Sequence, residues 1–470
     1  MNKKLRAALA ALIVAVVFRS QTSVIGELAR FAGGFQACDL PPALLERSTW
    51  ILADCIGVVC RGATAPEMAA FTRAHLRHAA AGQSWVIGAR VRSTSLAAAF
   101  VNGIAGTWHE LDEGCTLAKG HPAIQLMPAA LAEAQATRVS GRELLAAIAI
   151  GYEVSSRINR AGRIRPSVHP HGTFGVIGAA IAVARVRKLA QEDYARLINV
   201  ASGLALASSY NTISEGATVR NVFTGHSAAM GINAVDLTQA GFTGEANAAA
   251  MTFGTILGEA FSPEVALAGL GADWMTAGSY FKLQPTARSI HPTIDAVEDA
   301  LKRAPAGNLD PSRVSSIAVR TYWSASIKAQ KNISTAFGAK FSIPFAIATR
   351  IVNGRATLDC FDEDDVSNPA IQTLLHKVQV VENPEMTKAW PAAQPCDVDI
   401  RMEDGTVYSG RCVIVRGEPQ NPNTLAEVQG KFMNLTVPVW GAAFAARMWD
   451  ECMALDTIGD IAEWSAKFEL

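Results

Sequence analysis

Three of the nine histidines in this 470-residue chain stand directly before a proline, at His121-Pro122, His169-Pro170 and His291-Pro292. A random order of residues would give about 0.4 such pairs. Proline disfavours the helical conformation of the residue before it, so we expect each histidine at a break between elements. Because histidine changes charge near neutral pH, three rings at loop positions predict a proton-handling site. The plainer alternative is that each pair only begins or ends a helix.

One short segment concentrates polar side chains within an otherwise apolar half of the chain. Its members are His109, Asp112, Thr116, Lys119 and His121. A solvated loop between helices is the alternative, but residues 123–136 directly after it are apolar enough to be buried. The segment therefore predicts catalytic or binding side chains held against a core.

A second polar segment carries His169, His171, Gly172 and Thr173 in front of an apolar helical stretch. Gly172 permits a tight turn, and Thr173 can cap the helix that follows. The start of a helix, with its free backbone amides, suits an anion such as a carboxylate. The alternative is that Thr173 does no more than cap.

Cationic side chains stand in three further segments. Arg220 lies in a polar stretch between apolar helices and is suited to a bidentate grip on a carboxylate. Lys282 and His291 lie near the expected border between two domains, where ligand sites are common. Lys340, close to Phe345, is a weaker candidate for substrate contact. For each of these segments, incidental surface charge or packing is the alternative.

The polar groups are of the kinds that handle protons and carboxylates. The sequence holds no GxGxxG motif after a strand, no GxxxxGK[ST], no HExxH and no GxSxG. The scattered cysteines form no matched CxxC pairs. We therefore expect proton abstraction next to a carboxylate with no cofactor and no metal, in which one base removes the α-proton and cations hold the substrate.

The elements that must position these residues change in kind along the chain. From about residue 23 to 277, apolar and amphipathic helical patterns alternate with Gly, Pro and His breaks; examples are 129–136, 141–157, 173–187 and 227–240. Residues 314–322 and 396–415 instead alternate with period two, and Asp404-Gly405 between two such runs predicts a hairpin. We expect a mainly α protein: helices over 23–277, a smaller α+β lid over 278–417, and helices returning over 418–470.

Composition excludes several classes of partner. The net charge is zero and half the residues are apolar, which predicts no nucleic-acid partner and a small-molecule or protein partner. Residues 1–22 begin with basic side chains and an apolar run too short to span a bilayer. We expect an N-terminal extension there, with a signal or anchor as the alternative, and a cytoplasmic protein without a membrane partner.

Taken together and in order, these motifs resemble the MmgE/PrpD family, which includes dehydratases, decarboxylases and epimerases of small carboxylates. The resemblance rests on the blocks His109–Ala123 (HxxD, T, GHPA), His169–Gly175 (HPxGTFG), Glu215–Gly225, Ser289–Ala296 (SIHPTIDA) and Lys340–Phe345 (KFSIPF). It runs from about residue 23 to the end of the chain. It implies a helical domain with an inserted α+β lid, a metal-free site between the two, and a homodimer.

The resemblance also implies which residues face the substrate. By similarity to the family's cis-aconitate decarboxylases, the site positions are Asp112, Thr116, His121, His169, Arg220, His291 and Phe345. Arg220 stands where the decarboxylases have lysine, and Phe345 stands where they have tyrosine. The loss of a phenol removes a proton donor. These differences argue against decarboxylation and leave dehydration and epimerisation open.

The sequence as a whole predicts a cofactor-independent enzyme for a small di- or tricarboxylate. His121 and His169 are the expected acid–base pair, Asp112 orients or tunes a histidine, and His291 joins them. Arg220, Thr116, Lys119, Lys282 and Phe345 are the expected substrate contacts. Dehydration of a 2-methylcitrate-like substrate is the first hypothesis and epimerisation of an iminodisuccinate-like dicarboxylate the second. A non-catalytic carboxylate-binding protein is the alternative of another class.

Overall fold

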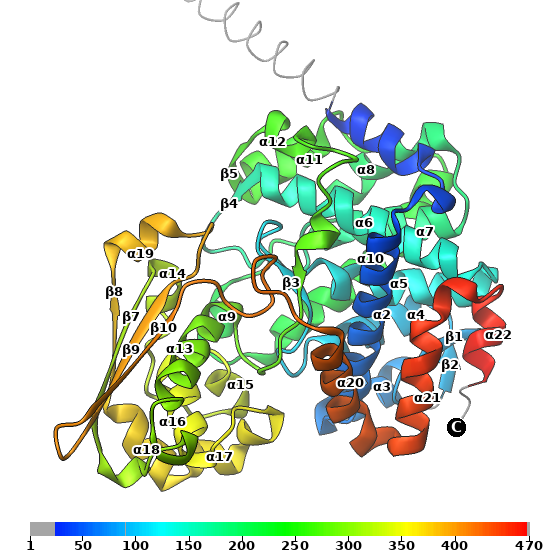
Figure 1. Cartoon of the computed structure of the whole chain (residues 1–470). Helices are drawn as coiled ribbons and strands as arrows, with labels where there is room; N and C mark the ends of the chain where they lie inside the picture. Colours follow the sequence, from blue (N-terminus) through cyan, green and yellow to red (C-terminus); the bar gives the residue numbers. More distant parts are fainter. Residues whose placement is uncertain (1–23, 90, 468–470) are drawn as a thin grey trace, which may run out of the picture.

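The computed structural model describes residues 24–89 and 91–467, and most of these are helical. Figure 1 shows the long helices gathered on one side of the molecule, a sheet on the other, and the short strand β3 between them. The prediction of a mainly α protein with a smaller α+β part is therefore confirmed. The expected N-terminal extension lies outside the described residues. No helix among the described residues is long and apolar enough to cross a membrane.

The helical part packs around apolar helices that are buried on nearly all sides. Its long elements are α2 (Pro42–Gly62), α3 (Pro66–Leu76), α4 (Ser95–Gly106), α5 (Pro122–Thr137), α6 (Gly141–Ala161), α7 (Gly175–Val186), α8 (Tyr194–Gly203) and α10 (Val222–Gln239). All apolar residues of α7 are buried, which fits a helix with no polar face. The expected helices over 129–136 and 141–157 fall within α5 and α6, and those over 173–187 and 227–240 overlap α7 and α10 but extend past their ends.

The last helices of the chain return to this same core. They are α20 (Leu425–Trp440), α21 (Ala442–Met453) and α22 (Ile461–Ala466). α20 packs along α2, where the buried Lys431 ammonium lies 2.6 Å from the Asp54 carboxylate. Val428, Phe432 and Trp464 belong to the same hydrophobic core as the first helices.

The α+β part has a hydrophobic core of its own, formed by buried residues between Ile290 and Val415. Its sheet has the order β10-β9-β7-β8, with β7 (Val314–Thr321), β8 (Val378–Glu382), β9 (Cys396–Met402) and β10 (Val407–Cys412). The β9–β10 hairpin turns at Gly405, whose φ of +87° requires glycine. The chain passes from the first core to the second between Phe281 and Ile290 and returns between Val415 and Val428, and the expected boundaries at 278 and 417 stay predictions.

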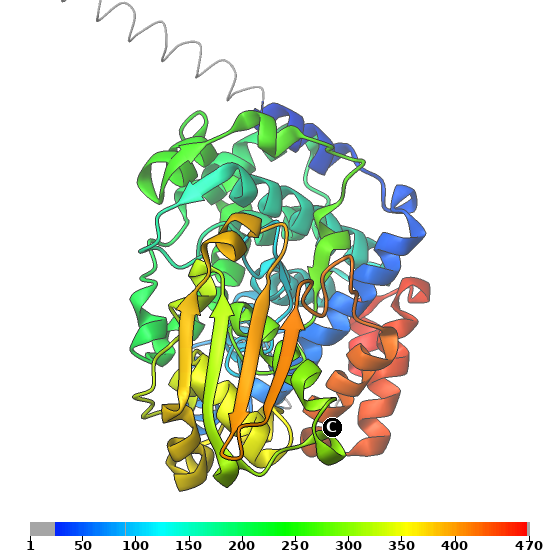
Figure 2. The ribbon, with the colours of Figure 1, turned by 60° about the vertical axis from the view of Figure 1, so that its left-hand side comes forward.

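Helices cover one face of this sheet. They are α13 (His291–Leu301), α16 (Ile343–Asn353) and α18 (Pro369–His376), and α13 packs directly on β9 and β10. Figure 2 shows the sheet in front of these helices. Burial alternates along β7 and β9, as expected for strands with one covered face.

Short elements bring the polar segments together between the two parts. β3 (Gly114–Cys115) pairs with β6 (Ser279–Tyr280), and β4 (Gly162–Ile164) pairs with β5 (Gly258–Phe261).

Short helices complete both parts. Those of the α+β part are α14 (Trp323–Ser326), α15 (Ala336–Ala339), α17 (Glu363–Ser367) and α19 (Pro384–Ala389). Those of the helical part are α9 (Asn211–Ser214), α11 (Ala248–Met251) and α12 (Pro263–Leu267).

Candidate active site

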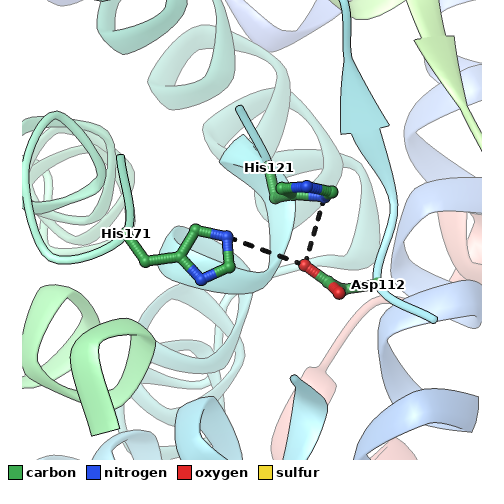
Figure 3. Close-up of side chains that lie close together, drawn as sticks. All are labelled: Asp112, His121 and His171. Atoms are coloured by element: carbon green, nitrogen blue, oxygen red, sulfur yellow. Dashed lines mark ion pairs between the residues drawn. The ribbon is translucent and has the colours of Figure 1, made fainter. Parts of the chain in front are cut away.

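Asp112 is the centre of a cluster of imidazoles. Its Oδ2 lies 3.2 Å from His121 Nδ1 and 3.9 Å from His171 Nε2. Figure 3 shows both rings directed at the same carboxylate oxygen, and the rings are perpendicular to each other with centroids 5.2 Å apart. The His169 ring follows at 4.6 Å from the His171 ring. Segments that are far apart in sequence thus place three histidines around one buried carboxylate.

The hydrogen bonds of His121 determine which of its nitrogens carries the proton. His121 is the residue before α5, and its Nδ1 lies 2.6 Å from the backbone carbonyl oxygen of Glu113. Because a carbonyl can only accept, Nδ1 must donate, and Nε2 then holds the lone pair. Burial lowers the pKa of His121, and Asp112 opposes that shift. A neutral ring with a free Nε2 lone pair is suited to accept a proton.

His169 has the opposite tautomer. Its Nδ1 lies 3.0 Å from the backbone nitrogen of His171, which can only donate, so the ring proton is on Nε2. Burial and the positive charge of Arg220 hold the pKa of His169 well below its usual value. The neutral ring therefore presents an N–H donor. The loop that carries it is tied to Ser208, whose hydroxyl donates to the carbonyls of His169 and His171.

His171 is a further candidate functional residue, which stands in the second polar segment but was not among the predicted acid–base residues. The side chain is fully buried, and within the described residues neither ring nitrogen has a hydrogen-bond partner. Desolvation holds its pKa well below the usual value. A buried imidazole without partners is costly, which is typical of functional sites. The His-Pro-His spacing was the available signal, because residues two apart in a loop can face one site.

Glu110 pairs with Arg220 and Lys282, the two cations that were expected to bind the substrate. Its carboxylate lies 2.6 Å from Arg220 NH2 and 2.9 Å from Lys282 Nζ, and Lys282 is also 3.4 Å from Asp112 Oδ1. Arg220 and Lys282 lower the pKa of Glu110 against its burial. Glu110 has a φ of +56°, a strained conformation that is common at functional sites. Arg220 and Lys282 are therefore already paired with carboxylates of the protein.

The position of His121 depends on buried neighbours. Glu113 Oε1 accepts a hydrogen bond from Tyr152, and Oε2 accepts one from the first turn of α5. Burial raises the pKa of Glu113 to about 8. A Cβ on Gly114 would lie 2.4 Å from the Tyr280 hydroxyl and 2.9 Å from His121 Nδ1, so only glycine fits between them.

The remaining predicted residues have contacts of their own outside the cluster of Asp112 and the three histidines. His291 begins α13, is buried, and its Nε2 lies 3.3 Å from the Thr286 carbonyl oxygen. Thr116 donates to Glu418 at 2.6 Å. Lys119 donates to the carbonyls of Arg160 and Gly162, at the end of α6. Phe345 packs against Phe361 in the core of the α+β part. Their assigned roles stay predictions.

The expectation that Thr173 caps the following helix was wrong. The residue before α7 is Phe174, with no side-chain cap, and the Thr173 hydroxyl instead donates to the Pro170 carbonyl. Gly172 does adopt a left-handed conformation, with a φ of +86°. The threonine therefore stabilises the turn that carries His169 and His171.

Asp112, His121 and His171 have ligand atoms within 4.8 Å of one another and could in principle hold a metal ion. However, His121 Nδ1 already donates to a carbonyl, and the Lys282 ammonium lies 3.4 Å from Asp112 Oδ1. Both features oppose a dication at this position. The absence of a metal and of a cofactor stays a prediction.

Comparison with known proteins identifies the family. Residues 26–264 match the MmgE/PrpD N-terminal domain and residues 285–455 match its C-terminal domain. The chain belongs to the MmgE/PrpD family. It is therefore an enzyme of the MmgE/PrpD type, as the sequence motifs predicted.

Similar proteins match nearly the whole chain. A cis-aconitate decarboxylase-like protein of Aspergillus oryzae is 24% identical, over 94% of this chain and 96% of its own length. The cis-aconitate decarboxylase of Aspergillus terreus is 23% identical over 94% and 95%. The human cis-aconitate decarboxylase is 23% identical over 87% of each chain. The similarity therefore includes both the helical part and the α+β part.

Proposed function

We propose that this protein is a cofactor-independent lyase that abstracts an α-proton from a small di- or tricarboxylate. The observation that carries the proposal is the opposite tautomers of the two histidines. His121 offers a lone pair at Nε2, and His169 offers an N–H at Nε2. A base and a hydrogen-bond donor on one substrate are what proton abstraction next to a carboxylate requires.

The proposed roles follow from these contacts. His121 Nε2 takes the α-proton, and Asp112 next to Nδ1 stabilises the imidazolium that forms. His169 donates its Nε2–H to the enolate oxygen as charge develops there. His171, with Asp112 Oδ2 at 3.9 Å, gains a proton when an anionic substrate raises its pKa and delivers it to the leaving hydroxyl. His291, at the start of α13, is proposed to reach the substrate from the α+β part.

Dehydration of a 2-methylcitrate-like substrate is the favoured reaction, because it uses the base and the acid in one turnover. Epimerisation of an iminodisuccinate-like dicarboxylate is the second candidate, since His121 and His171 lie on two sides of Asp112 and could act as two bases. The named relatives are cis-aconitate decarboxylases. Decarboxylation is disfavoured by Phe345, which has no phenol to donate a proton and lies in the α+β core.

Solvent deuterium exchange at the α-carbon of a panel of small carboxylates tests the proposal. Exchange together with new ultraviolet absorbance from a conjugated C=C bond supports dehydration. Exchange with inversion and no such absorbance supports epimerisation, and release of CO₂ without exchange supports decarboxylation. Binding of the panel with no reaction would leave a carboxylate-binding protein and reject the enzyme mechanism. The homodimer and the cytoplasmic location stay predictions; light scattering checks the former.

A further inference from the structure

Lys328 and Lys340 are buried cations that no carboxylate of the protein neutralises. Lys328 is 6% exposed and Lys340 is 4% exposed. Within the described part of the chain, neither ammonium has an ion pair or a side-chain hydrogen bond. A buried ammonium without a counterion is costly, so structures rarely keep one unless a ligand supplies the negative charge.

Lys328 approaches the histidine cluster through Tyr210, and Lys340 interacts electrostatically with Glu110 and Arg220 beside it. The Lys328 ammonium lies 5.2 Å from the centre of the Tyr210 ring, and Tyr210 lies 5.7 Å from the His169 ring. Lys340 directly follows α15, its carbonyl accepts from the Ala287 amide, and its charge acts on the buried His109 and on Glu110. Desolvation lowers the pKa of Lys340 to about 8. The two ammonium groups thus flank the same polar interior.

The charges of the cluster define the ligand. Arg220 and Lys282 pair with Glu110 and Asp112, so these four side chains neutralise one another. Lys328 and Lys340 remain, which leaves an excess of two positive charges while the histidines are neutral. A ligand with two negative charges would balance the site, whereas a monocarboxylate would leave one buried ammonium unpaired.

We propose that Lys328 and Lys340 form a carboxylate subsite, which binds the substrate carboxylate remote from the reacting carbon and selects for dianions. This inference rests on the proposed function for the identity of the substrate, but the charge argument is separate. The sequence singled out Arg220 and Lys282 as the main substrate cations, with Lys340 as a weaker candidate and Lys328 unnoticed. The protein's own carboxylates already bind Arg220 and Lys282.

Equilibrium binding of two unreactive probes, glutarate and butyrate, tests the subsite by calorimetry. We expect the wild-type protein to prefer the dianion glutarate, and Lys340→Met or Lys328→Met to weaken glutarate binding about tenfold or more with little change for butyrate. Lys340→Arg should restore most of the preference. Lys331→Met is the matched control, because Lys331 lies on the same segment and donates to the His376 carbonyl.

The melting temperature of the ligand-free protein gives an independent readout. Removal of an unpaired buried charge should leave the melting temperature of Lys340→Met equal to that of wild type or higher. If Lys340 instead had a structural role, the melting temperature of Lys340→Met would fall. A methionine variant that fails to fold, or that binds glutarate like wild type, overturns the subsite. So does a wild-type protein with no preference for glutarate. Lysine-dependent binding without α-proton exchange would keep the subsite and reject the proposed function; exchange with lysine-independent binding would do the reverse.

Discussion

At the scale of single residues, the backbone decides what each histidine can do. The Glu113 carbonyl fixes the proton of His121 on Nδ1, and the His171 amide fixes that of His169 on Nε2. The same substitution should therefore have unequal effects at the two positions. Glutamine keeps an N–H donor but offers no base, so His121→Gln should lower the exchange rate ~10²-fold or more and His169→Gln about tenfold. Equal losses, measured by deuterium exchange, would contradict the assignment.

A control for these variants is His226→Gln on α10, since the His226 ring contacts the Leu204 carbonyl and no side chain of the cluster. It should exchange at the wild-type rate. A large loss there would show that replacing a histidine of the helical part disturbs the fold whether or not it belongs to the cluster.

The pH dependence of kcat/KM is also set by single residues. Burial lowers the pKa of His121 below the usual 6.5, so activity should be lost only as the pH falls through that lowered value and the base is protonated. Lys340, with a pKa of about 8, loses its charge as the pH rises through about 8, and substrate binding weakens with it. In Lys340→Arg the guanidinium stays charged, so the alkaline limb should move to higher pH. An unmoved limb would exclude Lys340 as its cause.

At the scale of elements, the start of α5 is held by a buried acid. Glu113 accepts from Tyr152 and from the Ala123 amide, and its pKa in the folded protein is raised from 4.5 to about 8. Above pH 4.5 the unfolded chain ionises this group while the folded protein keeps it protonated, so its contribution to stability falls as the pH rises toward 8.

Glu113→Gln should remove this pH dependence. The variant keeps an acceptor and a donor in place of the protonated carboxyl, so it should lose less stability than wild type between pH 5 and pH 8. The difference should be about 1 kcal/mol or more, because one pKa unit corresponds to about 1.4 kcal/mol. Urea unfolding at both values of pH measures it, with the exposed Glu245→Gln as control. A parallel decline in both proteins would show that Glu113 is ionised in the fold.

At the scale of the whole molecule, Glu418 connects the two parts. Its Oε1 accepts from Thr116 at 2.6 Å, from Arg288 at 2.8 Å and from Gln394 at 3.0 Å. Thr116 belongs to the helical part, and the other two lie on the side of the sheet. Glu418 therefore links the helical part to the α+β part beside Thr116.

Glu418→Ala should loosen this link. The loss of a partly buried carboxylate shared by three donors costs about 1–3 kcal/mol in the closed state. We expect a higher KM with a smaller change in kcat, and faster hydrogen exchange in residues 283–290. Glu451→Ala, which removes only an exposed contact with Lys467, should change neither. Unchanged exchange in Glu418→Ala would show that other contacts hold the border.

The sequence predicted the elements better than the contacts between them. Periodicity located α6, α7, β7 and the β9–β10 hairpin, because burial of one face leaves a regular pattern in the chain. His121, His169, Asp112 and Arg220 could be singled out because polar residues in apolar surroundings are conspicuous. Glu110 and Lys328 could not be singled out in this way. Glu110 matters because it pairs with Arg220 and Lys282, and Lys328 matters because no carboxylate of the described residues pairs with it. The pairing of Arg220 with Glu110 depends on tertiary contacts that no local pattern encodes.

The return of α20–α22 to the first core has a consequence for synthesis on the ribosome. Residues 285–417 form a contiguous unit with its own core and can fold as soon as they emerge. The helical part must wait, because Phe432 and Trp464 complete the core of α2 and Lys431 neutralises the buried Asp54. The nascent chain therefore carries an incomplete, apolar helical half until its last segment arrives. Synthesis of α20–α22, and not of the catalytic residues, is therefore the step that completes the helical core.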